Sequence, residues 1–177
     1  MNRYRALLKY FLLTLFAVGL AGCSSLDSRD GASRYEGRFS ASIPDASGAF
    51  QNASGSFTFL EKNETGRLTL TSSVGIRIAE IDWNEGSSTI RIGNREPVEA
   101  AEPESALSEA LGIRIPVKRF SSWLTRAPIG QHASEAFTFE EDGWVVNVRQ
   151  RSENTRLVTA NQPELGIRVR LLATQEF

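Results

Sequence analysis

Short stretches in which apolar and polar residues alternate recur along most of this chain. Phe57 and Phe59 flank a threonine, and Ile90 and Ile92 flank an arginine. Because successive side chains of a strand point to opposite faces of a sheet, this period of two predicts β-strands that bury one face. The other apolar positions of the pattern are Phe39, Ala41, Ile43, Leu68, Leu70, Ile76, Ile78, Phe137, Phe139, Trp144, Val146, Val148, Ile167, Val169 and Leu171.

Turn-forming sequences separate these strands. Residues 44–48, 62–66, 84–86 and 142–143 are rich in glycine, asparagine, aspartate and proline, which favour tight turns. The strands therefore follow one another as hairpins, and we expect an antiparallel sheet with one apolar and one polar face. The polar face would carry the arginines at positions 77, 91, 149, 168 and 170.

Two segments near the middle of the chain have helical spacing instead. Residues 103–111 place alanines and leucines three and four positions apart, and Pro116 opens a second segment that Pro128 ends. Helices this short do not stay folded alone, so their apolar sides must pack on the apolar face of the sheet. The sequence therefore predicts a mainly β fold: an antiparallel, strongly curved, unclosed half-barrel with a lid of short α-helices inserted mid-chain.

The N-terminal segment has the pattern of an export signal. Arg3, Arg5 and Lys9 precede an uncharged stretch at residues 10–20. That stretch is far shorter than the ~20 residues of a membrane-spanning helix, which is typical of a cleaved secretory signal. We predict a signal peptide at residues 1–22, a polar and flexible tether at residues 23–33, and a single domain at residues 34–177.

Composition argues against several classes of function. Without the signal the chain has 17 basic and 21 acidic residues, and a net charge of −4 does not favour nucleic-acid binding. The single histidine, His132, lies in a polar stretch that we expect to be a surface loop. None of the motifs CxxC, HExxH, GxSxG or the phosphate-binding GxxxxGKS/T occurs. We therefore expect no enzyme, no metal site and no catalytic residue.

Three strings resemble a known family. Leu-Ala-Gly-Cys at residues 20–23 resembles the lipobox of bacterial lipoproteins, in which the signal is cut before a cysteine that becomes lipidated. Residues 68–75 are similar to the strand–loop–strand of the LolB family, in which an apolar residue before a glycine protrudes. Residues 111–128 are similar to that family's string Gly-x-x-Ile-Pro, an apolar residue, Trp and a downstream Pro. LolB proteins are outer-membrane lipoproteins that receive other lipoproteins and insert them into the membrane.

The resemblance implies the following expectations. Cys23 would carry a covalent N-acyl and S-diacylglycerol lipid, and no other cofactor is expected. Ser24 is compatible with an outer-membrane location facing the periplasm. The partners would be a LolA-like periplasmic carrier and triacylated lipoproteins as cargo, with the chain itself a monomer. Val74 would be the tip of a membrane-insertion loop, although the family typically has leucine there and often proline where this chain has Ser73.

Such a protein needs an apolar cavity that its own side chains do not fill. The resemblance implies that the sheet forms the cavity's base and the helices its lid. The expected base residues are Phe39, Phe57, Phe59, Leu68, Leu70, Ile76, Ile78, Phe137, Phe139, Ile167 and Val169, and the expected lid residues are Leu107, Leu111, Val117, Phe120 and Trp123. Two alternatives stay open: a lipoprotein of similar fold that binds a free lipid or glycolipid, and a structural envelope lipoprotein with a filled core.

Overall fold

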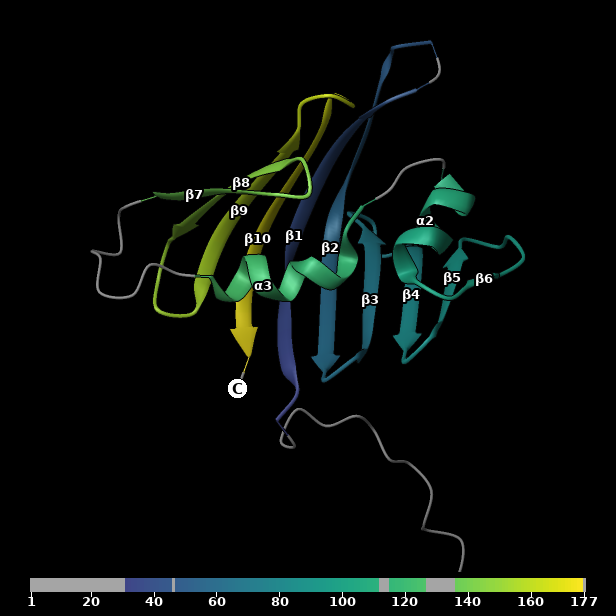
Figure 1. Ribbon diagram of the computed structural model, residues 1–177, viewed down its shortest axis with the longest axis horizontal. Coiled ribbons are helices and arrows are strands. Elements are labelled where there is room, and N and C mark those ends of the chain that lie inside the picture. Colours follow the sequence, from purple (N-terminus) through teal and green to yellow (C-terminus); the bar gives the residue numbers. More distant parts are fainter. Residues whose placement is uncertain (1–30, 46, 112–114, 127–135, 177) are drawn as a thin grey trace, which may run out of the picture.

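The computed structural model describes residues 31–45, 47–111, 115–126 and 136–176. Ten strands dominate it (Figure 1): β1 (Ser33–Pro44), β2 (Phe50–Lys62), β3 (Thr65–Ser72), β4 (Arg77–Asn84), β5 (Ser87–Ile92), β6 (Val98–Ala100), β7 (Ala136–Glu141), β8 (Trp144–Gln150), β9 (Thr155–Gln162) and β10 (Ile167–Glu176). They form one sheet in the order β6-β5-β4-β3-β2-β1-β10-β9-β8-β7, and every neighbouring pair is antiparallel. Within the described residues the edge strands β6 and β7 do not pair with each other, so the sheet stays open.

The helices lie mid-chain and cover the concave face of this curved sheet (Figure 1). The helix α2 (Pro103–Leu111) contacts β4, β5 and β6, whereas α3 (Phe120–Thr125) contacts β8 and β9. A 3₁₀ turn, η2 (Val117–Arg119), leads directly into α3. The predicted mainly β, unclosed fold with a mid-chain helical lid is thus confirmed. No helix among the described residues is long and apolar enough to cross a bilayer.

The second helical segment differs in detail from its prediction. We expected one helix starting at Pro116, but the chain makes a 3₁₀ turn first and α3 begins at Phe120. Pro116 precedes the turn with ψ near 76°, outside the helical region, while its carbonyl accepts a hydrogen bond from the Arg119 amide. The change of helix type leaves Val117, Phe120 and Trp123 buried.

The predicted turns lie between the expected strands. Asp142 and Gly143 both have positive φ, 51° and 78°, as a two-residue hairpin of type I′ requires. Asn63 has φ 55° in the turn between β2 and β3, in the left-handed region that asparagine tolerates. These turns fix the register of their hairpins and so decide which residues face the core.

Strand β4 has a different phase from the one predicted. Alternation in the sequence places Ile76 and Ile78 on the apolar face, but the side chains of β4 buried there are Ala79, Ile81 and Trp83. The register shifts at the end of the β3–β4 ladder next to the turn, so that Ile78 is an extra, half-buried residue of a bulge. A bulge reverses the alternation of the residues on either side of it.

Ile76 lies before the strand and is 68% exposed. It belongs to the turn at residues 73–76, in which the amide of Ser72 donates to the carbonyl of Ile76 at 2.8 Å. The placement of Ile76 in the cavity base is therefore corrected: its side chain points to solvent.

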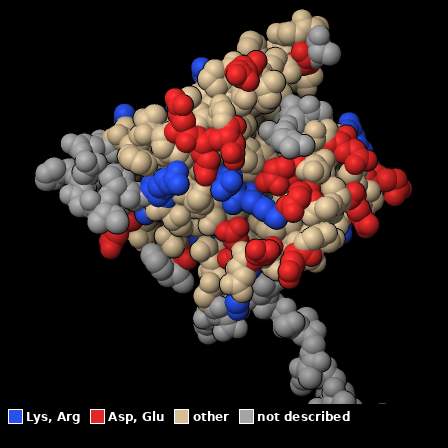
Figure 2. Space-filling view, viewed as in Figure 1, with Lys and Arg blue, Asp and Glu red and all other residues tan. Residues whose placement is uncertain are grey.

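The convex face of the sheet is polar, as predicted. The arginines at 77, 91, 149, 168 and 170 are all exposed. On the β3–β5 side they have acidic partners: Arg91 lies 2.8 Å from Asp82, and Arg77 lies 3.0 Å from Glu80. On the helical face, acidic and basic side chains are likewise intermixed (Figure 2).

Candidate functional site

An apolar cavity of about 290 Å³ lies between the concave face of the sheet and the lid. Only two of its lining residues, Gln51 and Asn52, are polar. The sheet contributes Phe39, Ala41, Ile43, Ala53, Leu68, Leu70, Ile78, Ala79, Ile81, Ile92, Val169 and Leu171, and the helical segment contributes Leu107, Ile115, Val117 and Phe120. A cavity lined in this way favours hydrocarbon over water, since an engineered apolar cavity of about 150 Å³ stays dry and binds benzene.

The sheet residues that line the cavity lie next to one another because their strands are paired. Phe39 and Ala41 on β1 lie directly opposite Leu171 and Val169 on β10. These two strands are the first and last in the sequence but are neighbours in the middle of the sheet, so the cavity wall depends on contacts between residues far apart along the chain. Residues that pair directly point to the same face, and alternation along each strand keeps this face apolar.

A second pair of strands supplies the adjoining wall. Leu68 and Leu70 on β3 lie opposite Ile81 and Ala79 on β4. The small side chain of Ala79 leaves room that a larger one would fill. The bulge then turns Ile78 far enough inward to line the cavity as well.

Polar contacts at the surface hold the lid over this space. Lys118 of η2 donates from its backbone amide to the Glu104 carboxylate at 3.1 Å and from Nζ to Glu102 at 2.5 Å, which joins η2 to α2 and to the residue before it. Arg119 lies 3.4 Å from Glu141 and from Asp142 at the β7–β8 turn. Exposed ion pairs contribute only about 0–1 kcal/mol each. These contacts therefore orient the lid but add little to the free energy that keeps it closed.

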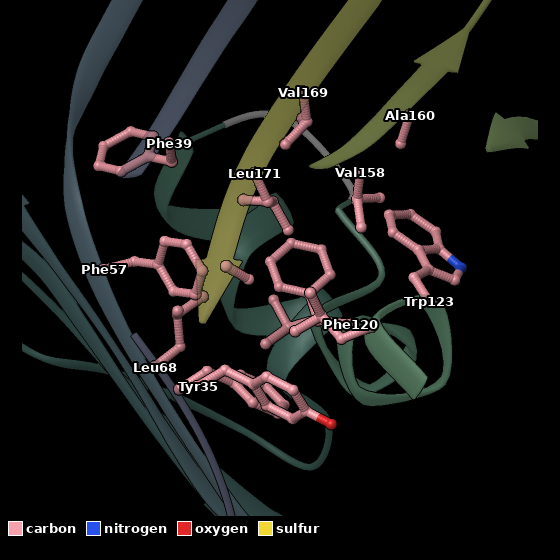
Figure 3. Packing of buried hydrophobic residues seen from close by; sticks show 14 of the residues in the cluster. Tyr35, Phe39, Phe57, Leu68, Phe120, Trp123, Val158, Ala160, Val169 and Leu171 are labelled. Atoms are coloured by element: carbon pink, nitrogen blue, oxygen red, sulfur yellow. The ribbon is translucent and has the colours of Figure 1, made fainter. Parts of the chain in front are cut away.

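The rest of the concave face is filled. A row of aromatic rings runs from Tyr35 through Phe59, Phe120 and Trp123 to Trp144, with centroids 5.5–6.4 Å apart. In Figure 3, Phe120 reaches into the middle of the buried cluster and Trp123 lies on the side away from Phe39. The concave face is therefore divided into a packed aromatic half and a hollow aliphatic half, and Phe120 belongs to both.

Several of the residues that we predicted for the cavity do line it. They are Phe39, Leu68, Leu70, Ile78 and Val169 on the sheet and Leu107, Val117 and Phe120 on the lid. Sequence reasoning did not assign the other lining residues to the cavity, although Ala41, Ile43 and Leu171 share the alternation of predicted ones: Ala41, Ile43, Gln51, Asn52, Ala53, Ala79, Ile81, Ile92, Ile115 and Leu171. Cys23 and the side chain of Leu111 lie outside the described residues.

Other predicted residues lie elsewhere in the core. Phe57, Phe59 and Ile167 are buried but do not reach the cavity. Trp123 packs in the aromatic row and donates from Nε1 to Glu141 at 2.8 Å. Phe137 and Phe139 are half-buried on β7, with their rings 5.6 Å apart and Arg126 over the Phe139 ring at 4.5 Å.

The buried polar groups near the core lie outside the cavity lining. Burial raises the pKa of the Tyr35 hydroxyl, and the nearby charge of Arg156 partly offsets this shift. Arg156 itself donates to the backbone carbonyl of Leu124. Among the described residues no three His, Cys, Asp or Glu side chains are grouped as a metal ion would need. The site is thus suited to holding hydrocarbon.

The turn between β3 and β4 exposes two apolar side chains. Val74 is 79% exposed and Ile76 is 68% exposed. The Gly75 amide donates to the Ser72 carbonyl at 3.0 Å, and the Ile76 amide donates to the Ser72 hydroxyl at 3.1 Å. These bonds, with φ at +84° for Gly75, hold the turn in a conformation that presents both side chains to solvent.

An open antiparallel sheet that holds an apolar cavity under short helices defines a class of protein that binds apolar ligands. The family model described as "Outer membrane lipoprotein LolB" matches residues 33–172. The chain is 30% identical over 173 residues to the outer-membrane lipoprotein LolB of Bordetella petrii, covering 88% of this chain and 87% of that protein. It is 33% identical over 161 residues to LolB of Ralstonia nicotianae (80% and 77%) and 34% identical over 163 residues to LolB of Cupriavidus pinatubonensis (82% and 77%). The chain therefore belongs to the LolB family of outer-membrane lipoproteins.

Proposed function

We propose that this protein is an outer-membrane-anchored acceptor that receives lipoproteins from a periplasmic carrier and inserts them into the outer membrane. The observation that carries the proposal is the apolar cavity under the lid. An acyl chain in water costs about 0.8 kcal/mol for each exposed CH₂ group. A receiving protein must therefore shield the chains of its cargo, and an unfilled apolar cavity supplies that shielding.

The cavity argues against the structural alternative. A scaffold lipoprotein would gain stability from a filled core, because a void loses packing contacts. Here the sheet and lid leave about 290 Å³ unfilled although large aromatic side chains pack tightly beside it. No enzymatic step is proposed. Transfer runs down an affinity gradient, from the carrier to this protein and then to the bilayer.

The lid must move for a complete cargo to enter. A cavity of about 150 Å³ holds the six carbons of benzene, so by proportion 290 Å³ holds about a dozen carbons, fewer than one long acyl chain. Three chains need the space that α2 and η2 now cover. This movement would break the exposed ion pairs Lys118–Glu102 and Arg119–Asp142 at little cost. It would also uncover the buried side chains of Leu107 and Val117, which the incoming acyl chains would cover again.

The anchor and the partners follow from the same proposal. Cys23 carries the acyl chains, signal cleavage occurs after residue 22, and residues 24–33 tether the monomeric domain to the periplasmic side of the membrane. The partners are a LolA-like carrier and triacylated lipoproteins. The arginines that line the convex face on β8 and β10 are available to an acidic partner.

Filling the cavity tests the proposal. Ala41 and Ser40 are neighbours on β1, but Ala41 lines the cavity whereas Ser40 is exposed on the convex face. In a chain freed of its anchor by Cys23→Ala, we expect Ala41→Phe to abolish uptake of a fluorescent triacylated peptide from a loaded carrier. Ser40→Phe should leave uptake unchanged.

Normal uptake by Ala41→Phe would overturn the proposed use of the cavity. Binding of free lipid with no uptake from the carrier would favour the free-lipid alternative.

A further inference from the structure

The two halves of the sheet's convex face differ in how their arginines are paired. On the β3–β5 half, Arg67 and Arg91 both pair with Asp82. Arg77 pairs with Glu80. On the half formed by β1, β8, β9 and β10, five exposed arginines take part in none of the ion pairs within the described residues. We call these five the arginine face: Arg38, Arg149, Arg151, Arg168 and Arg170.

The strand register places two leucines between arginines of this face. Arg38 on β1 lies opposite Leu172 on β10, which lies opposite Leu157 on β9. Leu157 in turn lies opposite Arg149 on β8. The row crosses three strand spacings, about 14 Å, and Leu172 in its middle is 40% exposed. An apolar centre with a cation on either side suits a surface that is both apolar and anionic.

An open groove of about 700 Å³ lies along this row. Arg38, Arg151 and Arg170 line it together with Leu157 and Leu172. Hydroxyl groups complete its polar lining, from Ser40, Ser54 and Thr155. None of the described residues that line the groove is acidic. Guanidinium groups bind phosphate through paired hydrogen bonds, so the groove is suited to an amphiphile with a phosphate headgroup.

Acidic residues lie around the border of the arginine face: Glu36, Asp45, Glu140, Glu153, Glu164 and Glu176. Three of them already have partners. Glu36 and Glu176 pair with Arg34, and Asp45 accepts hydrogen bonds from the amide and the hydroxyl of Ser47. The middle of the face therefore keeps its positive charge, whereas the charges of the β3–β5 half are paired.

We propose that the arginine face lies on the anionic phospholipid headgroups of the membrane to which the chain is tethered, so that the lid faces away from the bilayer. The choice of a bilayer over the carrier rests on the function proposed above. Acyl chains cannot pass through a close-packed sheet, so a carrier that delivers them to the concave face does not dock on the convex one. Strands β1 and β10 lie in the middle of the sheet, behind the helices in Figure 1. A flat surface therefore meets this part of the convex face first.

The length of the tether permits this orientation. Ten residues of chain separate Cys23 from Ser33, the first residue of β1, and such a length reaches at most about 35 Å. Arg38 lies five residues further, about 17 Å along the strand. The anchor and the arginine face can therefore meet the same leaflet. Tethering also raises the local concentration of the lipid surface, so a contact of low affinity is sufficient.

Vesicle binding tests the contact. We expect the chain with Cys23→Ala to bind vesicles of phosphatidylethanolamine and phosphatidylglycerol, and to bind vesicles with phosphatidylcholine in place of phosphatidylglycerol far less. Each basic residue near an anionic surface strengthens binding about fivefold, so Arg38→Gln with Arg170→Gln should weaken binding about 25-fold.

The matched control is Lys62→Gln with Arg95→Gln. It removes the same charge from exposed residues outside the arginine face, and binding should change little. The proposal would be overturned if the unaltered chain did not bind the phosphatidylglycerol vesicles, or if the two double variants weakened binding equally.

A fluorescent label tests the orientation. Cys23 is the only cysteine, so in a chain with Cys23→Ala a cysteine introduced by Leu172→Cys or Ser105→Cys is labelled alone. We expect an NBD label at position 172 to brighten and shift to shorter wavelength with the phosphatidylglycerol vesicles. A label at position 105, exposed on α2 of the lid, should stay in water. Equal responses at the two positions would overturn the orientation. A label at position 172 that responds only to the carrier would assign the arginine face to a protein.

Uptake of cargo separates this inference from the proposed function. Neither Arg38 nor Arg170 lines the cavity, so the double variant should take up acylated peptide from a loaded carrier at the unaltered rate. Loss of uptake in this variant alone would mean that the carrier docks on the arginine face, which overturns the proposal. Loss of uptake in the unaltered chain would instead overturn the acceptor function. Normal uptake without vesicle binding would overturn the membrane contact alone.

Discussion

Gly66 on β3 lies face to face with Trp83 on β4, so closely that a Cβ added to Gly66 would fall 2.2 Å from Cζ2 of the indole. The Trp83 ring in turn packs on Phe59, with centroids 5.8 Å apart. The absent side chain of Gly66 is therefore the space that Trp83 occupies, and the two residues together close one end of the aromatic half of the core.

Gly66→Ala should destabilise the fold. The added methyl group also meets the carbonyl oxygen of Leu60 at 2.7 Å, so the clash cannot be relieved by moving Trp83 alone. Overpacking of this kind costs about 1–3 kcal/mol. Thermal unfolding should show a lower Tm, with altered tryptophan fluorescence. Ser56→Ala, on the exposed face of β2, is the control and should leave Tm unchanged. An unaltered Tm for Gly66→Ala would show that the indole has room to shift.

Tyr35 should make the protein less stable in alkaline solution. Burial raises the pKa of its hydroxyl in the folded protein above the ordinary value of 10.0. Above pH 10 the unfolded chain loses this proton while the folded chain keeps it, so the free energy of unfolding falls as pH rises through that range. Below pH 10 both states keep the proton, and Tyr35 adds no pH dependence.

The matched variant is Tyr35→Phe. The hydroxyl of Tyr35 is buried and makes no hydrogen bond within the described residues, so its removal should cost little stability at pH 7. Denaturant unfolding at pH 7 and pH 11 should show a smaller alkaline loss in Tyr35→Phe than in the unaltered chain. If the free energy of unfolding fell equally in the two chains between pH 7 and pH 11, groups other than Tyr35 would be responsible for the alkaline sensitivity.

The strands and helices of this fold could be predicted because their signals are local. Alternation at Phe57 and Phe59, turn residues at 142–143 and helical spacing at residues 103–111 each depend on neighbours in the sequence. The phase of β4 was mispredicted because the strand contains two alternations that differ by one residue. Ile76 and Ile78 suggest one phase, whereas Ile81 and Trp83, which alternate with charged residues, give the phase that the structure has and leave Ile76 at the surface.

The sequence also could not predict which part of the concave face is packed and which part holds the cavity. Phe39 and Phe59 were both predicted to face the core from alternating strands, yet Phe39 lines the cavity whereas Phe59 is buried among aromatic rings. What distinguishes them is the volume of the side chains across the sheet, with Ala41 and Ala53 near one and Tyr35 and Trp83 near the other. That volume depends on strand order and register, which alternation does not give.

Val74→Glu should separate cargo uptake from membrane insertion. Val74 is exposed at the tip of its turn and makes no part of the core, so the variant should fold and take up acylated peptide normally. A carboxylate at the tip disfavours entry into the bilayer, so insertion of cargo into liposomes should slow. Ser73→Glu, the adjacent exposed residue, controls for added charge. Equal insertion rates for Val74→Glu and the unaltered chain would refute a membrane role for this turn.

Trp123→Phe should weaken the fold without weakening the binding of cargo. The indole packs at a tilt between Phe120 and Trp144 and donates to Glu141 at 2.8 Å, but it does not line the cavity. Replacing it removes that hydrogen bond and leaves a void, which together cost about 1–3 kcal/mol. Tm should fall while the affinity for a dansyl fatty acid stays the same below the unfolding transition.

Val117→Ala is the contrasting variant, because Val117 lines the cavity and its loss should change the affinity directly. A large loss of affinity in folded Trp123→Phe would mean that the aromatic half of the core also opens to admit acyl chains.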